Sequence, residues 1–202
     1  MRISLSLPFI FISFITRISA QNLILNPGFE EHDTFLVDST ASHYEWSGFG
    51  VKNWTVPNES YPWFAATTAE NDENVRYFDE ITPHSGKAFS GLCLYSPYNA
   101  RYYLQGEFSQ PLKAGKRYKF TIHLALGKYS TYNIDQFGVY FGKTKVSQPV
   151  KNEITVITTQ LILNVSGVFA KKSRWVEVSG FYVDTGDEKY FVIGNFRKKI
   201  GR

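Results

Sequence analysis

From Arg117 to Leu126, apolar side chains occupy every second position, and Lys119, Thr121 and His123 stand between them. A period of two places the apolar residues on one face of a β-strand and the polar residues on the other. On a helix the same residues would be scattered around the axis and would form no apolar stripe. The segment is therefore predicted to be a strand with one face on a core, and chains that contain such strands fold into sheets.

Other segments share the composition of strands, because they are rich in β-branched or aromatic residues and are bounded by Gly, Pro, Asn or Asp. With 17% aromatic residues and no amphipathic stretch of helical length, the chain is predicted to be all-β. We expect a β-sandwich of two antiparallel sheets. Residues Asp184 to Asp187 have the composition of a hairpin turn. The further predicted strands are Asn22–Leu25, Lys87–Tyr95, Arg101–Phe108, Phe137–Phe141, Glu153–Asn164, Arg174–Val183 and Lys189–Phe196.

Residues 1–20 have the pattern of a signal peptide. Arg2 precedes an apolar stretch from Ile3 to Ile15, and Ala20 is a small residue at the predicted cleavage site. The apolar stretch is short for a membrane span, so we expect cleavage and secretion, with no span in the mature chain. Residues 21–202 contain no repeat and no linker, and we expect them to form one domain.

Charge and motif patterns argue against several functions. The net charge of +4 falls to +2 without residues 1–20, and the remaining cations outside the last six residues are scattered, which does not favour nucleic-acid binding. The four histidines and the single cysteine, Cys93, form no zinc pattern, and no serine-nucleophile motif is present. We expect no enzyme activity, no internal disulfide, and a buried thiol at Cys93.

Two features are open to a binding role. Residues 31–74 are rich in polar residues and turn formers, and a long irregular stretch with several tryptophans is a candidate for recognition. The acidic cluster of Glu30, Glu31 and Asp33 is typical either of a hard-cation ligand set or of a solvated loop, and both interpretations stay open.

An ordered set of motifs resembles carbohydrate-binding modules with the galactose-binding-domain-like jelly roll. The similarity covers residues 22–196 and is closest to a subgroup found at the N-terminus of secreted envelope proteins of gram-negative bacteria. In that subgroup an outer-membrane-protein-A-like domain that binds peptidoglycan often follows. The motifs are Asn22-Leu-Ile-Leu-Asn-Pro-Gly-Phe-Glu30, Pro83-His-Ser-Gly-Lys-Ala88, Tyr103-Leu-Gln105, Pro111-Leu-x-x-Gly-x-x-Tyr118, Phe137-Gly-Val-Tyr-Phe141, Trp175-x-x-Val-Ser-Gly180 and Glu188-Lys-Tyr-Phe-Val-Ile-Gly-Asn-Phe196.

The resemblance implies further details. Gly28 and Gly86 stand where tight turns need backbone freedom. The family commonly holds a structural calcium through the glutamate that matches Glu30 and through an aspartate on the final strand. Because the chain ends at Arg202 without such a strand, we expect a C-terminally truncated sandwich that lacks its last strand.

Sugar recognition needs flat aromatic faces with amides or carboxylates that bond hydroxyl groups. The candidate residues are Trp54, Trp63, Tyr95, Tyr98 and Tyr132, with Asn99 and Gln105 as polar partners. Because aromatic rings in a sandwich more often belong to the core, a core role is favoured for any single one of these rings, and Trp175 is expected in the core.

The leading hypothesis is a non-catalytic module that binds a glycan, a cell-wall polysaccharide or peptidoglycan, outside the cell or in the cell envelope. The alternative is a structural or protein–protein interaction module of a cell-surface protein with no sugar site. A third hypothesis is an accessory domain of a glycoside hydrolase. Fold alone does not choose among these, because jelly rolls host many functions.

Overall fold

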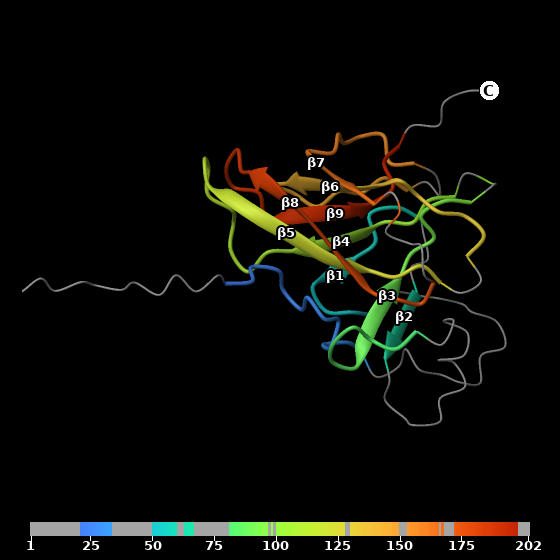
Figure 1. Ribbon diagram of the computed structural model, residues 1–202. Coiled ribbons are helices and arrows are strands. Elements are labelled where there is room, and N and C mark those ends of the chain that lie inside the picture. Colours follow the sequence, from blue (N-terminus) through green and yellow to red (C-terminus); the bar gives the residue numbers. More distant parts are fainter. Residues whose placement is uncertain are drawn as a thin grey trace, which may run out of the picture.

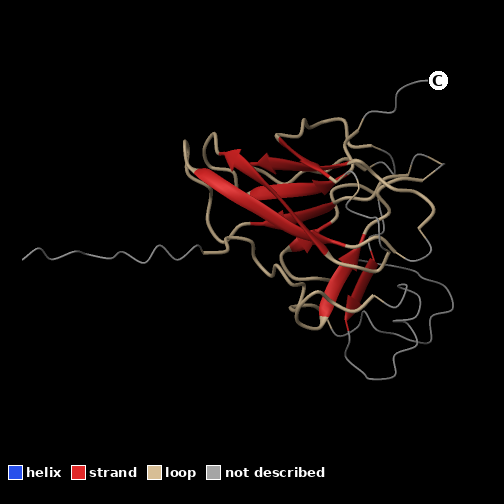
Figure 2. Cartoon of the chain, in the orientation of Figure 1, coloured by secondary structure: helices blue, strands red, loops and turns tan. Residues whose placement is uncertain are grey.

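The computed structural model describes residues 21–33, 50–59, 63–66, 81–96, 98, 100–127, 130–149, 153–165, 167 and 172–197 (Figures 1 and 2). Within these ranges all regular elements are β-strands, and there is no helix that could cross a membrane. The strands are β1 (Trp54–Thr55), β2 (Trp63–Ala66), β3 (Ala88–Gly91), β4 (Leu104–Glu107), β5 (Arg117–Leu124), β6 (Gln136–Gly142), β7 (Leu161–Asn164), β8 (Val176–Val183) and β9 (Tyr190–Gly194).

The strands form antiparallel sheets in the order β1-β4-β9-β6-β7, β2-β3 and β5-β8. The β5-β8 pair, which runs from Arg117 opposite Val183 to Leu124 opposite Val176, lies across the five-stranded sheet (Figure 1). The β2-β3 pair lies beyond the end of β5, where Phe89 contacts Trp175 at a ring-centroid distance of 5.9 Å. This layering confirms the predicted all-β class and is consistent with a sandwich.

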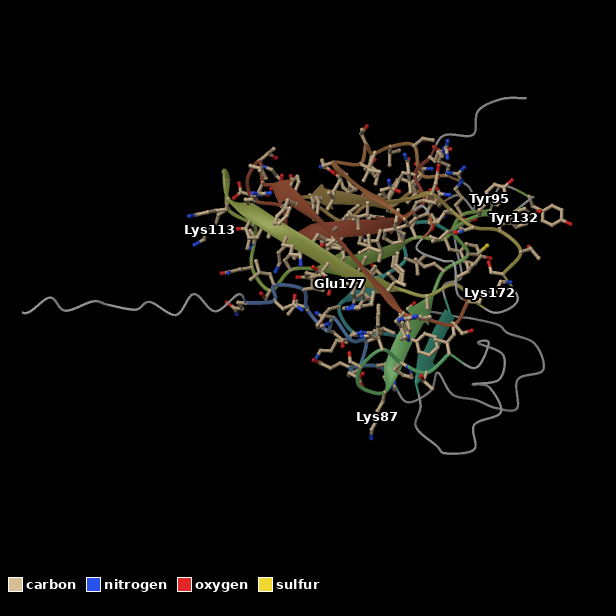
Figure 3. The ribbon with its side chains drawn as sticks, viewed as in Figure 1. Lys87, Tyr95, Lys113, Tyr132, Lys172 and Glu177 are labelled. Carbon is tan, nitrogen blue, oxygen red and sulfur yellow. The ribbon has the colours of Figure 1, made fainter. Side chains whose placement is uncertain are left out.

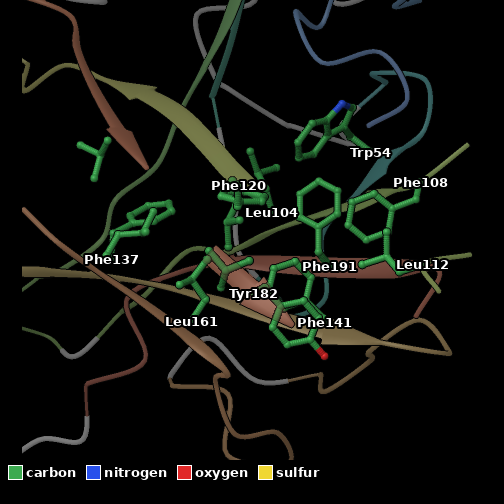
Figure 4. Close-up of a cluster of buried hydrophobic side chains, with 14 of the residues drawn as sticks. Trp54, Leu104, Phe108, Leu112, Phe120, Phe137, Phe141, Leu161, Tyr182 and Phe191 are labelled. Carbon is green, nitrogen blue, oxygen red and sulfur yellow. The ribbon is translucent and has the colours of Figure 1, made fainter. Parts of the chain in front are cut away.

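Aromatic rings from both layers meet in the core (Figure 4). From the five-stranded sheet, Phe191 is fully buried and Phe141 nearly so. Phe120 of β5 lies 5.8 Å from the Phe191 ring, and Tyr182 of β8 stacks on Phe141 at 4.1 Å. Because these rings come from facing sheets, their burial removes apolar surface from water only when the layers are together.

The alternation of apolar and polar residues predicted β5 well, whereas residue composition alone predicted the lengths of other strands poorly. The period-two segment forms β5, in which Phe120 is buried, Lys119 is exposed and Thr121 is half-buried. The predicted strand 153–164 is regular only at Leu161–Asn164. Before it, the side-chain oxygen of Gln148 accepts hydrogen bonds from the amides of Thr155 and Val156, so these amides need no neighbouring strand. At the N-terminus, the predicted strand 22–25 is reduced to one bridge between Ile24 and Phe108.

The turn at Asp184–Asp187 does not close a hairpin, and that prediction was wrong. β8 pairs with β5 and β9 pairs with β4 and β6, so this turn carries the chain from one layer to the other. Its backbone bonds instead to the turn before β5, because the Gly115 amide donates to the Asp184 carbonyl at 2.9 Å. Turn composition is the same for a hairpin and for a crossing between layers, so the sequence does not separate the two.

Candidate functional site

Two of the predicted site residues, Tyr95 and Tyr132, meet on the surface at one end of the sandwich (Figure 3). Their rings lie 5.1 Å apart between centroids at an angle of 70°, so the edge of one ring meets the face of the other. An edge-to-face contact covers each ring only in part, and Tyr95 and Tyr132 remain 41% and 47% exposed. We call Tyr95 and Tyr132 the tyrosine pair.

Hydrogen bonds to neighbouring strands hold the segment that carries Tyr95. This segment follows β3, and the Asn195 side chain, just after β9, donates to the Leu94 carbonyl at 3.0 Å. The Tyr102 amide donates to the Cys93 carbonyl at 2.9 Å, and the Cys93 thiol lies 3.4 Å from the Tyr95 carbonyl. Cys93 is half-buried rather than buried as predicted, and this partial burial raises the pKa of its thiol.

A second set of bonds holds the segment that carries Tyr132, between β5 and β6. The Ser130 hydroxyl donates to the Tyr132 carbonyl at 2.9 Å, and the Ser130 amide donates to Gly127 at 3.1 Å. The Lys172 ammonium donates to the Ser130 carbonyl at 2.8 Å. Hydrogen bonds from Asn195 and Lys172 therefore tie the two segments to distant parts of the chain, and this pre-positions the tyrosine pair.

The structure places Trp54 in the core, so we leave this residue out of the candidate site. Its ring lies 4.7 Å from Phe29 and 5.4 Å from Phe191, and its indole nitrogen donates to the Asn26 carbonyl at 2.9 Å. Gln105, the predicted polar partner, is also buried. Its side chain bonds Thr55 at 3.0 Å and the Val146 amide at 2.7 Å, which ties β1 and the loop after β6 to β4.

The remaining predicted aromatic and amide residues are placed only in part. Tyr98 stands in a turn three residues after Tyr95 and is 91% exposed. Trp63 begins β2 and pairs with Gly91, but its side chain lies outside what the structure describes. Asn99 and most of residues 31–74 also lie outside the described ranges.

Glu30 supports a turn through hydrogen bonds to backbone amides. Its Oε1 accepts from the amides of Lys87 and Ala88 at 2.8 and 3.2 Å, at the start of β3. Gly86 uses the backbone freedom that was predicted for it, with a left-handed φ of 67°, whereas Gly28 has no positive φ. Among the described residues, no three acidic, histidine or cysteine side chains gather as a metal site. Calcium prefers six to eight oxygen ligands, so the described residues do not by themselves assemble a calcium site, and calcium at Glu30 stays a prediction.

The tyrosine pair can do two things chemically: offer apolar ring surface and present phenol groups to water. Exposed polar side chains, Thr131 and Asn133, flank Tyr132 in the chain. Such a surface suits a ligand that has both C–H faces and hydroxyl groups. Sequence reasoning missed the supports of the pair, Ser130, Lys172 and Asn195, because they act through backbone carbonyls and belong to no motif.

Comparisons of this chain with protein-family models, with characterised proteins and with solved structures found no match.

Proposed function

We propose that this chain is a non-catalytic glycan-binding module with a jelly-roll sandwich, secreted through residues 1–20 and acting in the cell envelope. The tyrosine pair stacks on a sugar of a polysaccharide or of peptidoglycan. The observation that carries this proposal is an exposed edge-to-face contact between Tyr95 and Tyr132, which come from distant chain segments and are held by hydrogen bonds. Large rings that are partly exposed and pre-positioned favour a binding role over a packing role.

The path of the chain supports the jelly-roll part of the proposal. The chain passes from β4 in the five-stranded sheet to β5 in the other layer, returns for β6 and β7, crosses to β8 and returns for β9. In the five-stranded sheet, β4 and β6 are both neighbours of β9, so strands that are distant in the chain lie side by side. Repeated crossing of the chain between two antiparallel sheets is typical of jelly rolls and Greek keys.

The test is retention of the protein on a panel of polysaccharides, including peptidoglycan. We expect at least one glycan to retain the wild type, and the double variant Tyr95→Ala/Tyr132→Ala to bind that glycan at least tenfold more weakly, since each ring contributes about 1 kcal/mol. Phe181→Ala is the matched control, because Phe181 is an equally exposed ring, 55% exposed, near the opposite end of the sandwich. A folded wild type that no glycan retains would contradict the proposal.

One observation favours the alternative of a protein-interaction module. Phe181 and Val183 are both exposed and lie on the outer face of β8, and the Arg117 guanidinium stands 3.9 Å above the Phe181 ring. An aromatic and an aliphatic side chain next to an arginine are typical of protein interfaces. If Phe181→Ala abolishes an interaction that the tyrosine variants retain, this second function replaces the first.

A further inference from the structure

Two carboxyl groups are buried together where the chain passes from β8 to β9. Asp184 follows β8 directly and is 2% exposed, and Glu188 precedes β9 and is 3% exposed. The backbone at both residues is fixed, because the Asp184 amide donates to Lys116 at 3.0 Å and the Glu188 carbonyl accepts from Leu112 at 2.9 Å. Two ionised carboxylates in one buried turn repel each other and lose their hydration, so the fold must reduce this charge.

The two carboxyl groups differ in their hydrogen bonds. Glu188 accepts bonds from the Tyr182 hydroxyl at 3.1 Å, from the Thr185 hydroxyl and from the Gly186 amide at 2.9 Å. Neither side-chain oxygen of Asp184 has a hydrogen-bond partner, donor or acceptor, among the described residues. Donors around a carboxyl group favour its ionised form, and burial without donors favours the neutral acid. The negative charge therefore belongs on Glu188 and a proton belongs on Asp184.

Among the described residues, no cationic side chain bonds to the Asp184 carboxyl group. In the turn itself, Asp187 is exposed and adds negative charge, and Lys143 at the end of β6 lies 3.6 Å from it. Lys189, at the start of β9, pairs with Glu107 at 3.3 Å. In the turn before β5, the side chains of Lys113 and Lys116 are exposed.

The pKa values follow the same division. Burial raises the pKa of Asp184, and the neighbouring Glu188 raises it further, to about 6. Burial also pushes the pKa of Glu188 upward, but the neighbouring Asp184 and the hydrogen bonds from Thr185 and Tyr182 outweigh this effect and lower it to about 2. Burial, followed by the bond to Glu188, raises the pKa of Tyr182 to about 12, so its hydroxyl keeps its proton.

We propose that Asp184 keeps a proton in the native fold while Glu188 stays ionised, so that mild acid stabilises the turn between the two layers. The folded chain then holds a proton that the unfolded chain, with an ordinary aspartate pKa of 3.8, releases. Stability therefore rises as the pH falls from about 7 to about 5, and it is lost as the pH rises through about 6. When the pH falls below the ordinary glutamate pKa of 4.5, Glu188 becomes protonated in the unfolded chain but stays ionised in the fold. The free energy of unfolding therefore falls again.

The first test compares chemical unfolding of the wild type and Asp184→Asn at pH 7 and pH 5. The amide mimics the neutral acid and removes the titration. We expect the unfolding equilibrium constant of the wild type to fall roughly tenfold more between these pH values than that of Asp184→Asn. The matched control is Asp187→Asn, which removes an exposed charge three residues further on and should keep the wild-type dependence. The proposal is overturned if the wild type and Asp184→Asn depend on pH equally.

A second measurement needs no variant and works even if Asp184→Asn fails to fold. The carbon-13 chemical shift of the Asp184 carboxyl group should titrate near pH 6 in the native wild type, and titration near 3.8 would contradict a proton held by Asp184. A third measurement compares the melting midpoint in calcium chloride with that in EDTA at pH 7.5, for the wild type and for Asp184→Asn. We expect calcium to change the two midpoints by the same amount. A rise in the wild type that Asp184→Asn lacks would place a cation between the carboxylates and overturn the proposal.

Discussion

The core around Phe191 and the tyrosine pair use the same type of side chain for opposite purposes. Phe191 is fully buried among Trp54, Phe108 and Phe120, with ring centroids 5.0 to 5.8 Å away. Tyr95 and Tyr132 touch each other at a similar distance, 5.1 Å, but nearly half of each side chain meets water. Ring contact alone therefore does not separate core from surface, and exposure does.

This difference in exposure indicates that the buried rings contribute to stability and the exposed rings to binding. A ring enclosed by other rings gains free energy from burial and packing, and its loss leaves a cavity. A half-exposed ring has little burial to lose, so substitution should leave the fold intact and change only what the surface binds. We therefore expect core substitutions to lower the free energy of unfolding, and tyrosine substitutions to lower ligand affinity.

The largest effect should come from Phe191→Ala. The substitution removes the ring that contacts both layers and should cost about 3–5 kcal/mol of unfolding free energy, because the rigid surroundings cannot fill the space. Urea unfolding followed by circular dichroism measures this loss. A cost below about 1 kcal/mol would mean that Phe191 is not enclosed as the structure places it.

A smaller effect is expected at the turn that Glu30 supports. Gly86 and Gly115 have similar left-handed φ values of 67° and 73°, but a Cβ at Gly86 would meet Glu30 Oε1 at 2.1 Å, whereas Gly115 faces open space. Gly115→Ala should cost about 1 kcal/mol from backbone strain, and Gly86→Ala about 1–2 kcal/mol more, because the carboxylate must leave the amides of Lys87 and Ala88. Equal losses in urea unfolding would mean that the Glu30 contact contributes nothing.

Trp54→Phe tests whether a core ring also binds ligand, because the sequence placed Trp54 among the candidate ligand-binding residues. The variant keeps an aromatic ring in the core but loses the indole bond to the Asn26 carbonyl, so we expect a loss of about 1–2 kcal/mol. Glycan affinity should not change. If affinity falls while the fold is retained, Trp54 belongs to the binding site after all.

The smallest effect on stability is expected for Tyr132→Ala. Its ring is nearly half exposed, so the loss should stay within about 0.5 kcal/mol, a size typical of surface substitutions. Thermal unfolding without ligand measures it. A loss as large as that of Trp54→Phe would make the tyrosine pair a structural cluster and remove the main reason to regard it as a binding site.

The sequence predicted strands where side chains alternate, as in β5, and overestimated them where composition alone was the guide, as in residues 153–160. Alternation reports two faces directly, whereas composition does not reveal that the Gln148 side chain occupies the amides of Thr155 and Val156. The sheet to which each strand belongs also could not be predicted, because a hairpin and a crossing between sheets use the same turn residues.

The candidate site could be predicted as residue types but not as a group. Tyr95, Tyr132 and Trp54 carry the same signal in the sequence, and only the fold buries the tryptophan and brings the tyrosines together. The carboxyl pair was missed for the opposite reason. Asp184 and Glu188 flank a turn sequence that is typical of a solvated surface, and their burial depends on the packing of that turn against residues 112–116.

We propose that the tyrosine pair binds a glycan, whereas the aromatic core only stabilises the fold. The direct measurement is the thermal midpoint with and without the glycan that retains the protein, for the wild type, Tyr95→Ala/Tyr132→Ala, Trp54→Phe and Phe181→Ala. A ligand that binds only the native state raises the midpoint. We predict a rise in the wild type, Trp54→Phe and Phe181→Ala, and none in the double tyrosine variant. An undiminished rise in the double tyrosine variant would contradict the claim.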